Sequence, residues 1–188
     1  MARPANHPAA LNGRIGVLLV NLGSPEAPTR AAVRSYLKEF LSDRRVVEIP
    51  PLLWQPILHG FVLTTRPSRS AHAYAQIWTE EGSPLVAITR RQAEKVQTAL
   101  GSDVIVDWAM RYGQPSISDR LAALQAAGCD RILLAPLYPQ YSSATTATVF
   151  DAAAAALAEM RWQPSLRVLP PYYDDPAYIG ALETSVAA

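Results

Sequence analysis

The sequence predicts an α/β domain with an open, mostly parallel four-stranded sheet flanked by helices. Short, almost wholly apolar runs recur along the 188 residues, and segments with helical spacing of apolar residues separate them. Wholly apolar runs are typical of strands buried on both faces of a parallel sheet. Their alternation with helices indicates crossover connections, which are right-handed when the strands are parallel.

In the first half of the chain, residues 14–21 form the first predicted strand, and the turn residues Leu22-Gly23-Ser24-Pro25 end it. Residues 29–42 carry one apolar helical stripe. Two further helices are expected over residues 52–63 and 68–78. A fourth is expected over residues 85–100, with Gly101 well placed to end it.

The second half alternates between strands and helices. The predicted strands are 103–110, 131–137 and 165–169, and the predicted helices between them are 116–127 and 145–160. Asp174-Asp175-Pro176 opens a last helix with an N-cap and a first-turn proline. We expect residues 1–13 to be a flexible tail and residues 14–188 to form the folded unit.

Composition excludes several classes of function. Hydrophobic residues make up 49% and charged residues 18%, which is typical of a globular protein. A net charge of +1 without any basic run argues against a nucleic-acid partner. Cys129 is the only cysteine, so one chain can build neither a disulfide nor a cysteine-based zinc or iron–sulfur site. With no secretory signal and no apolar stretch long enough to span a bilayer, we expect a soluble cytoplasmic protein.

Three segments are candidates for a ligand site because they follow predicted strands. In open α/β sheets, ligands bind beyond the carboxyl ends of the strands. Each segment mixes small residues, prolines and hydrogen-bonding groups where a plain connection needs only a few turn residues. The segments are 21–25, 110–115 and 137–146.

Two of these segments admit both a structural and a functional interpretation. Tyr138 and Tyr141 flank a rigid turn before a Ser/Thr-rich helix start, yet two amphipathic rings at a strand end also suit a flat aromatic ligand. Arg111 either pairs with a surface carboxylate or holds a ligand carboxylate bidentately. No loop has the glycine spacing that cradles phosphates, which counts against a nucleotide.

The segment 52–63 is apolar nearly all round. Such a helix is usually buried, but it can instead form an apolar lip over a hydrophobic ligand or contact a membrane surface. His7, His59 and His72 show no metal-ligand spacing with one another, so we interpret them as structural or solvent-facing. The residues alone therefore indicate a pocket for an apolar ligand, without an identifiable acid–base or metal centre.

The same segments resemble the ferrochelatase family, in family order and with family-like spacing. The matching stretches are Gly16–Glu26, Arg66–Tyr74 with Gly82–Leu85, Arg111–Gly113, and Leu137–Ser142 with Thr145-Thr146. The resemblance implies a lyase of haem biosynthesis, with Fe²⁺ and protoporphyrin IX as substrates and no cofactor bound by this chain. It also implies two Rossmann-like lobes that grip the porphyrin between them.

Carried over by position, the resemblance assigns porphyrin contacts to one set of residues, and Leu22 in place of a tyrosine favours protoporphyrin IX over coproporphyrin III. It makes 52–63 a pocket lip that contacts the membrane periphery. The expected porphyrin-binding residues are Leu22, Arg66, Ser83, Arg111, Tyr112, Tyr138, Tyr141 and Ser142.

The resemblance also implies what these 188 residues lack. The family's catalytic histidine lies in a Ser-x-His-(Gly/Ser)-(Leu/Ile)-Pro stretch, and its acidic partner lies in the second lobe; neither occurs here. We therefore expect residues 14–188 to be an amino-terminal lobe without its second lobe, and to be inactive alone. A non-catalytic tetrapyrrole-binding module, an α/β domain for a smaller metabolite, and another chelatase of the same fold remain alternatives.

Overall fold

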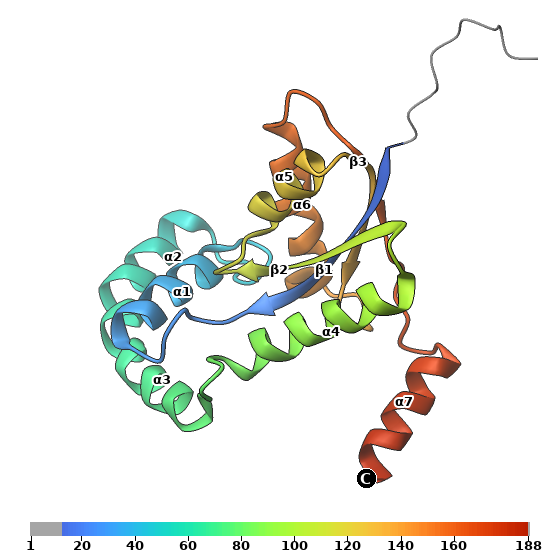
Figure 1. The fold of residues 1–188 in the computed structure, drawn as a ribbon. Coiled ribbons are helices and arrows are strands. Elements are labelled where there is room, and N and C mark those ends of the chain that lie inside the picture. The colour runs from blue at the N-terminus through green and yellow to red at the C-terminus, as the bar shows by residue number, and fades with distance from the viewer. Residues whose placement is uncertain (1–12, 188) are drawn as a thin grey trace, which may run out of the picture.

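The computed structural model describes residues 13–187 and contains one parallel sheet (Figure 1). Its strands are β1 (Arg14–Gly23), β2 (Val104–Tyr112), β3 (Cys129–Pro136) and β4 (Ser165–Val168), in the order β2-β1-β3-β4. All three strand pairings are parallel. The predicted fold class is therefore confirmed. The predicted tail lies outside the described residues, Gly13 apart.

Helices cover both faces of the sheet. Helix α4 (Pro84–Leu100) lies on one face, and α5 (Ile117–Ala126) and α6 (Thr148–Ala158) lie on the other (Figure 1). Because successive side chains of a strand point to opposite faces, Leu18 and Val20 pack with α5 and α6, while Val17 and Leu19 pack with α4. Each face thus has its own apolar core.

A third group of helices lies beyond the carboxyl ends of β1 and β2 (Figure 1). It comprises α1 (Arg30–Ser42), α2 (Pro51–Ile57), a π-helical turn η1 (Leu58–Val62) and α3 (Leu63–Ile77). Its core contains Val33, Leu37, Leu58 and Leu63, and it also includes Tyr112 at the end of β2. This contact anchors the helical group to the edge of the sheet where a ligand is expected.

The predicted break between helices 52–63 and 68–78 is wrong, because the chain stays helical from α2 through η1 to the end of α3. Pro67 lies inside α3, where a proline deprives the carbonyl four residues earlier of its usual donor. That carbonyl belongs to Leu63, and the Arg34 Nε–H of α1 donates to it at 3.1 Å. A tertiary contact thus replaces the intrahelical hydrogen bond that Pro67 cannot donate.

Two strands are longer than predicted. Parallel pairing between β1 and β2 continues to Gly23 opposite Tyr112, so Leu22, Arg111 and Tyr112 are the final residues of strands rather than loop residues. The predicted helix 145–160 starts as a π-helical turn, η2 (Ser143–Ala147), before α6.

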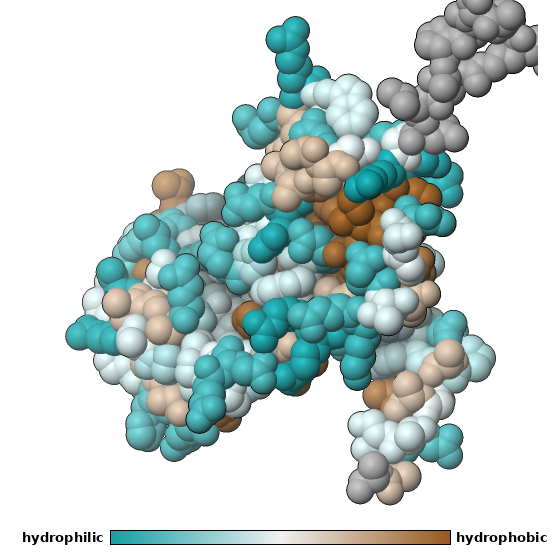
Figure 2. Space-filling model, in the orientation of Figure 1, coloured by the Kyte–Doolittle hydropathy of each residue, from teal (hydrophilic) through white to brown (hydrophobic). Residues whose placement is uncertain are grey.

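The last helix, α7 (Pro176–Ala187), begins where the N-cap was predicted, since the Asp175 carboxylate accepts hydrogen bonds from the Ala177 and Tyr178 amides at 2.9 and 3.3 Å. None of its described residues is buried, and it stands away from the sheet in the space-filling view (Figure 2).

Candidate functional site

The loops after the strands are held together at the carboxyl edge of the sheet. The Leu137 amide donates to the Val20 carbonyl at 2.8 Å, and the Tyr172 amide donates to the Pro139 carbonyl at 3.0 Å. On the other side, the Tyr36 hydroxyl donates to the Gly23 carbonyl at 3.3 Å. These contacts connect β1 and the segments after β3 and β4 with helix α1, and Gly23 lies opposite Tyr112 in the sheet, so the predicted candidate segments converge at one edge.

Tyrosines form the centre of this edge. Tyr112 is fully buried, and Leu22 packs against the cluster that contains Tyr112 and Tyr36. Burial raises the pKa of the Tyr138 phenol well above its usual value, and the neighbouring phenols of Tyr112 and Tyr36 raise this pKa further. The Tyr138 hydroxyl is buried without a hydrogen-bond partner among the described residues. A buried polar atom without a partner is the kind of group that a ligand or water satisfies.

Arg111 is held by partners inside the protein. Its Nη2 donates to Asp43 Oδ2 at 2.5 Å, and its Nε donates to the Thr148 carbonyl at 2.8 Å. Its guanidinium also lies 4.3 Å from the centre of the Tyr112 ring. Of the two interpretations of Arg111, the structure contains the pairing with a carboxylate, although Asp43 is largely buried rather than on the surface.

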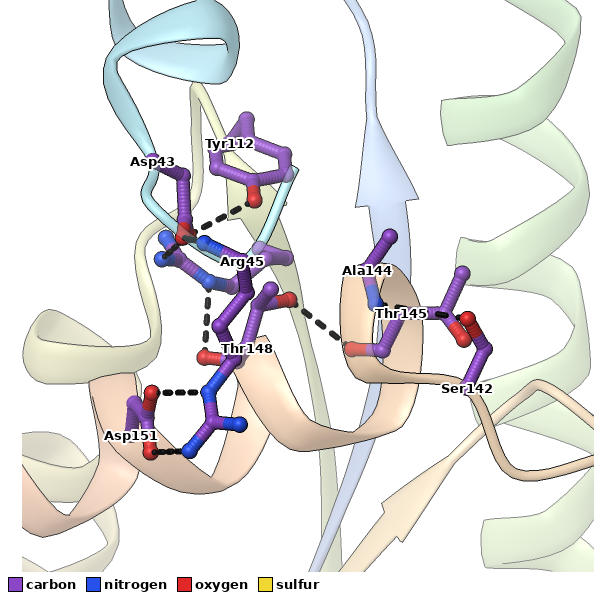
Figure 3. A network of polar contacts seen from close by, with 9 residues as sticks. Asp43, Arg45, Tyr112, Ser142, Ala144, Thr145, Thr148 and Asp151 are labelled. Carbon is purple, nitrogen blue, oxygen red and sulfur yellow. Dashed lines mark hydrogen bonds and ion pairs between the residues drawn. The ribbon is translucent and has the colours of Figure 1, made fainter. Parts of the chain in front are cut away.

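Tyr141 and Ser142 lie at the rim of the same edge. Tyr141 is 59% exposed, and the Ser142 hydroxyl caps η2 by accepting from the Ala144 amide at 3.3 Å. Next to them, Arg45 makes a bidentate ion pair with Asp151 (Figure 3). The hydrogen bond from Arg45 lowers the pKa of the Asp151 carboxyl.

Arg66 and Ser83 do not join this network directly. Arg66 is exposed and lines an open hollow of about 550 Å³ with Arg69. Burial raises the pKa of the nearby Tyr74, which packs against the Tyr36 and Tyr112 cluster, and the charge of Arg66 opposes part of this rise. Ser83 is buried at the start of α4 without a side-chain capping bond. The predicted site residues thus divide into a central group, a rim and two outlying positions.

The predicted helix 52–63, which is apolar nearly all round, is largely exposed. The interpretation of this helix as a buried one is therefore wrong. Leu52 is 90% exposed, Leu53 64% and Phe61 66%, whereas Leu58 and Leu63 are buried in the core of the helical group. No helix among the described residues is long and apolar enough to cross a membrane. An apolar surface therefore lies beside the site on α2 and η1.

Sequence reasoning missed Asp43, Thr148 and Tyr36. Asp43 stands in the charged run Asp43-Arg44-Arg45 after α1, which resembles an ordinary solvated helix end. Tyr36 lies on the apolar stripe of α1 and was interpreted only as core. Within residues 13–187, no group of three or more His, Cys, Asp or Glu side chains has a metal-binding arrangement, and both described histidines are exposed.

Fold and site together define a parallel α/β domain with a cluster of aromatic side chains at the carboxyl edge of its sheet. The ferrochelatase family model matches residues 14–188. The ferrochelatase of Rhizobium meliloti (strain 1021) is 58% identical over 184 residues, which are 96% of this chain and 54% of that protein. The ferrochelatase of Azoarcus sp. (strain BH72) is 56% identical over 184 residues, 97% of this chain and 51% of that protein. The chain belongs to the ferrochelatase family, and it spans about half the length of these curated relatives.

Proposed function

We propose that this chain supplies the amino-terminal wall of a porphyrin slot in a ferrochelatase, the lyase that inserts Fe²⁺ into protoporphyrin IX to form protohaem in haem biosynthesis. Family membership supports the substrate class. The location rests on Leu22 and Tyr138, which are both partly buried at one sheet edge and both lie near the fully buried Tyr112. The Tyr138 hydroxyl is buried and has no hydrogen-bond partner among the described residues. Aromatic and aliphatic side chains are the natural wall for a flat macrocycle.

Porphyrin metallation requires removal of two pyrrole protons while a dehydrated Fe²⁺ reaches the ring nitrogens. It needs a base within hydrogen-bond reach and benefits from a bent macrocycle, at a strain of roughly 1–5 kcal/mol supplied by remote binding energy. The wall proposed here contributes binding energy and orientation. Arg66, Ser83, Tyr141 and Ser142 are proposed as peripheral contacts.

The central groups of this wall cannot accept the pyrrole protons. Burial raises the pKa values of the Tyr36, Tyr112 and Tyr138 phenols, so these phenols stay protonated near neutral pH and act as donors. The Asp43 carboxylate is already occupied by Arg111 and Tyr112. We therefore propose that the 188-residue chain binds the porphyrin but does not metallate it alone.

A paired titration and turnover assay tests this proposal. Protoporphyrin IX is titrated into the purified chain and followed by its absorbance, and Fe²⁺ or Zn²⁺ is then supplied under anaerobic conditions. We expect saturable absorbance shifts without metallation by the chain alone, and metallation when the carboxy-terminal half of a related ferrochelatase is added. Absence of porphyrin binding would refute the location of the slot, and turnover by the chain alone would refute its inactivity.

The exposed side chains of α2 and η1 support a proposed membrane contact beside the slot. Leu52, Leu53 and Phe61 form an apolar surface on a helical segment without acidic or lysine side chains. Side chains of this kind insert into the interfacial region of a bilayer rather than across it. A cytoplasmic protein with peripheral membrane contact is the arrangement we propose, and it would let an apolar porphyrin enter from the lipid.

A further inference from the structure

Asp43 connects the helical group to the edge of the sheet. It directly follows α1, and its Oδ2 accepts from Arg111 at 2.5 Å and from the Tyr112 hydroxyl at 2.9 Å (Figure 3). Its Oδ1 accepts from the Arg45 amide at 2.8 Å. One carboxylate thus fixes two consecutive residues at the end of β2, and both of its oxygens are in use.

The pair of Asp43 and Arg111 is shielded from solvent. The two side chains are 12% and 16% exposed, so neither charge is well solvated by water. A charge that has lost most of its water needs a charged, hydrogen-bonded partner, and removing one partner leaves the other uncompensated. Arg111 has the Thr148 carbonyl as its other acceptor, which is neutral. Asp43 is therefore the group that decides where the Arg111 guanidinium rests.

The position of Arg111 in turn shapes the proposed porphyrin wall. Its guanidinium lies 4.3 Å from the centre of the Tyr112 ring, and Tyr112 belongs to the cluster against which Leu22 packs. A displaced guanidinium would release one side of the Tyr112 ring and would also remove the link to α6 through Thr148. Asp43 itself acts only through these two residues.

We propose that Asp43 is a positioning residue of the porphyrin slot, whose carboxylate holds Arg111 and Tyr112 in the geometry that receives the macrocycle. This inference rests on the proposed function, because the slot itself is proposed. The proposal adds a residue that acts on porphyrin through other side chains and that lies in a charged run resembling an ordinary solvated helix end.

The test uses Asp43→Asn, which removes the charge with little change of shape, and Asp119→Asn as the matched control. Asp119 is an exposed acidic residue in the first turn of α5, and the acceptors of Arg111 are Asp43 and Thr148 instead. Two readouts are needed. Protoporphyrin IX titration gives the dissociation constant, and the ¹⁵N-correlated Nε–H resonance of Arg111, assigned by its loss in Arg111→Met, reports whether the guanidinium stays bound to its internal acceptors.

We expect Asp43→Asn to weaken porphyrin binding about tenfold, as loss of a group that orients a binding side chain commonly does. The Arg111 Nε–H resonance should move and exchange faster with water, while Asp119→Asn changes neither readout. Because Asp43 acts through Arg111 and Tyr112, the loss of affinity in the double variant of Asp43→Asn with Arg111→Met should be smaller than the sum of the two single losses. A purely structural role would instead give additive losses.

The outcomes separate this inference from the proposed function. If the unsubstituted chain binds no porphyrin, both the proposed function and the role of Asp43 are refuted. If it binds porphyrin and Asp43→Asn binds equally well, or if the double variant shows additive losses, only the role of Asp43 is overturned. If Asp43→Asn does not fold, Asp43→Glu is used instead, because this substitution keeps the negative charge and changes its position. We expect the porphyrin affinity of Asp43→Glu to lie between the affinities of the unsubstituted chain and of Arg111→Met. The Arg111 Nε–H resonance should shift. Unchanged affinity with a shifted resonance would overturn the inference.

Discussion

Substituting Gly23 by alanine is expected to disrupt both the fold and the site. Gly23 ends β1 with φ at +113°, in a region that side chains rarely adopt. A Cβ atom built there would lie 1.8 Å from the Tyr112 carbonyl oxygen and 2.9 Å from its carbonyl carbon. No side-chain rotation relieves this overlap, because both atoms belong to the backbone of β2.

The size of the effect follows from these two terms. A non-glycine residue at such a φ costs about 1–3 kcal/mol. The overlap additionally forces β1 and β2 apart by more than about 1 Å, since real Cβ contacts with carbonyl oxygens lie beyond about 3 Å. Gly23 pairs with Tyr112 in the sheet, so the separation also loosens the wall of the proposed slot. Together we expect a loss of more than about 4 kcal/mol, in the range of exceptional single substitutions.

Urea unfolding followed by circular dichroism measures this loss, with Gly128→Ala as the control. Gly128 also has positive φ, at +87°, but a Cβ there meets nothing within 4 Å. The control should therefore lose only about 1–2 kcal/mol, the conformational cost of a left-handed backbone. Equal losses for Gly23→Ala and Gly128→Ala would refute the close approach of β1 to Tyr112 as the reason for the glycine.

Three further outcomes follow from the described contacts. Tyr112→Phe removes the hydroxyl that donates to Asp43 at 2.9 Å while Arg111 still pairs with that carboxylate, so urea unfolding should show a loss of about 1.5 kcal/mol; an unchanged midpoint would contradict it. Asp151→Asn should destabilise the chain at neutral pH, because the Arg45 ion pair lowers the pKa of the Asp151 carboxyl in the folded state. The difference in stability should vanish as pH falls below this lowered pKa, where the carboxyl is protonated in both the folded and the unfolded chain. A difference that persists at acid pH would argue against the ion pair with Arg45. Leu52→Glu should reduce sedimentation of the chain with anionic lipid vesicles while leaving its melting temperature unchanged, because Leu52 is 90% exposed; unaltered co-sedimentation would count against the membrane contact.

Much of the fold was readable from the sequence because the strands are locally encoded. The apolar runs before Gly23 and around Ile132 are typical of a buried parallel strand, and both form strands of the parallel sheet. The carboxyl-edge rule then brought Leu22, Tyr112 and Tyr138 to one edge without knowledge of the side-chain contacts.

What the sequence did not reveal depends on contacts between distant residues. Asp43 and Arg111 are 68 residues apart, and no local pattern distinguishes this carboxylate from its solvated neighbours. Likewise, the helix continues through Pro67, and the donor that satisfies the freed Leu63 carbonyl comes from Arg34 in another helix. Local propensity is overridden wherever a tertiary partner replaces a missing local hydrogen bond.

The location of the porphyrin wall is tested most directly by the ring current of a bound macrocycle. Protoporphyrin IX added to the isotope-labelled chain should shift the methyl resonances of Leu22 and the ring resonances of Tyr138 and Tyr141 together, and should leave those of α7 unchanged. Shifts confined to α7, or to the exposed side chains of α2 without Leu22 and Tyr138, would contradict a slot at the carboxyl edge of the sheet.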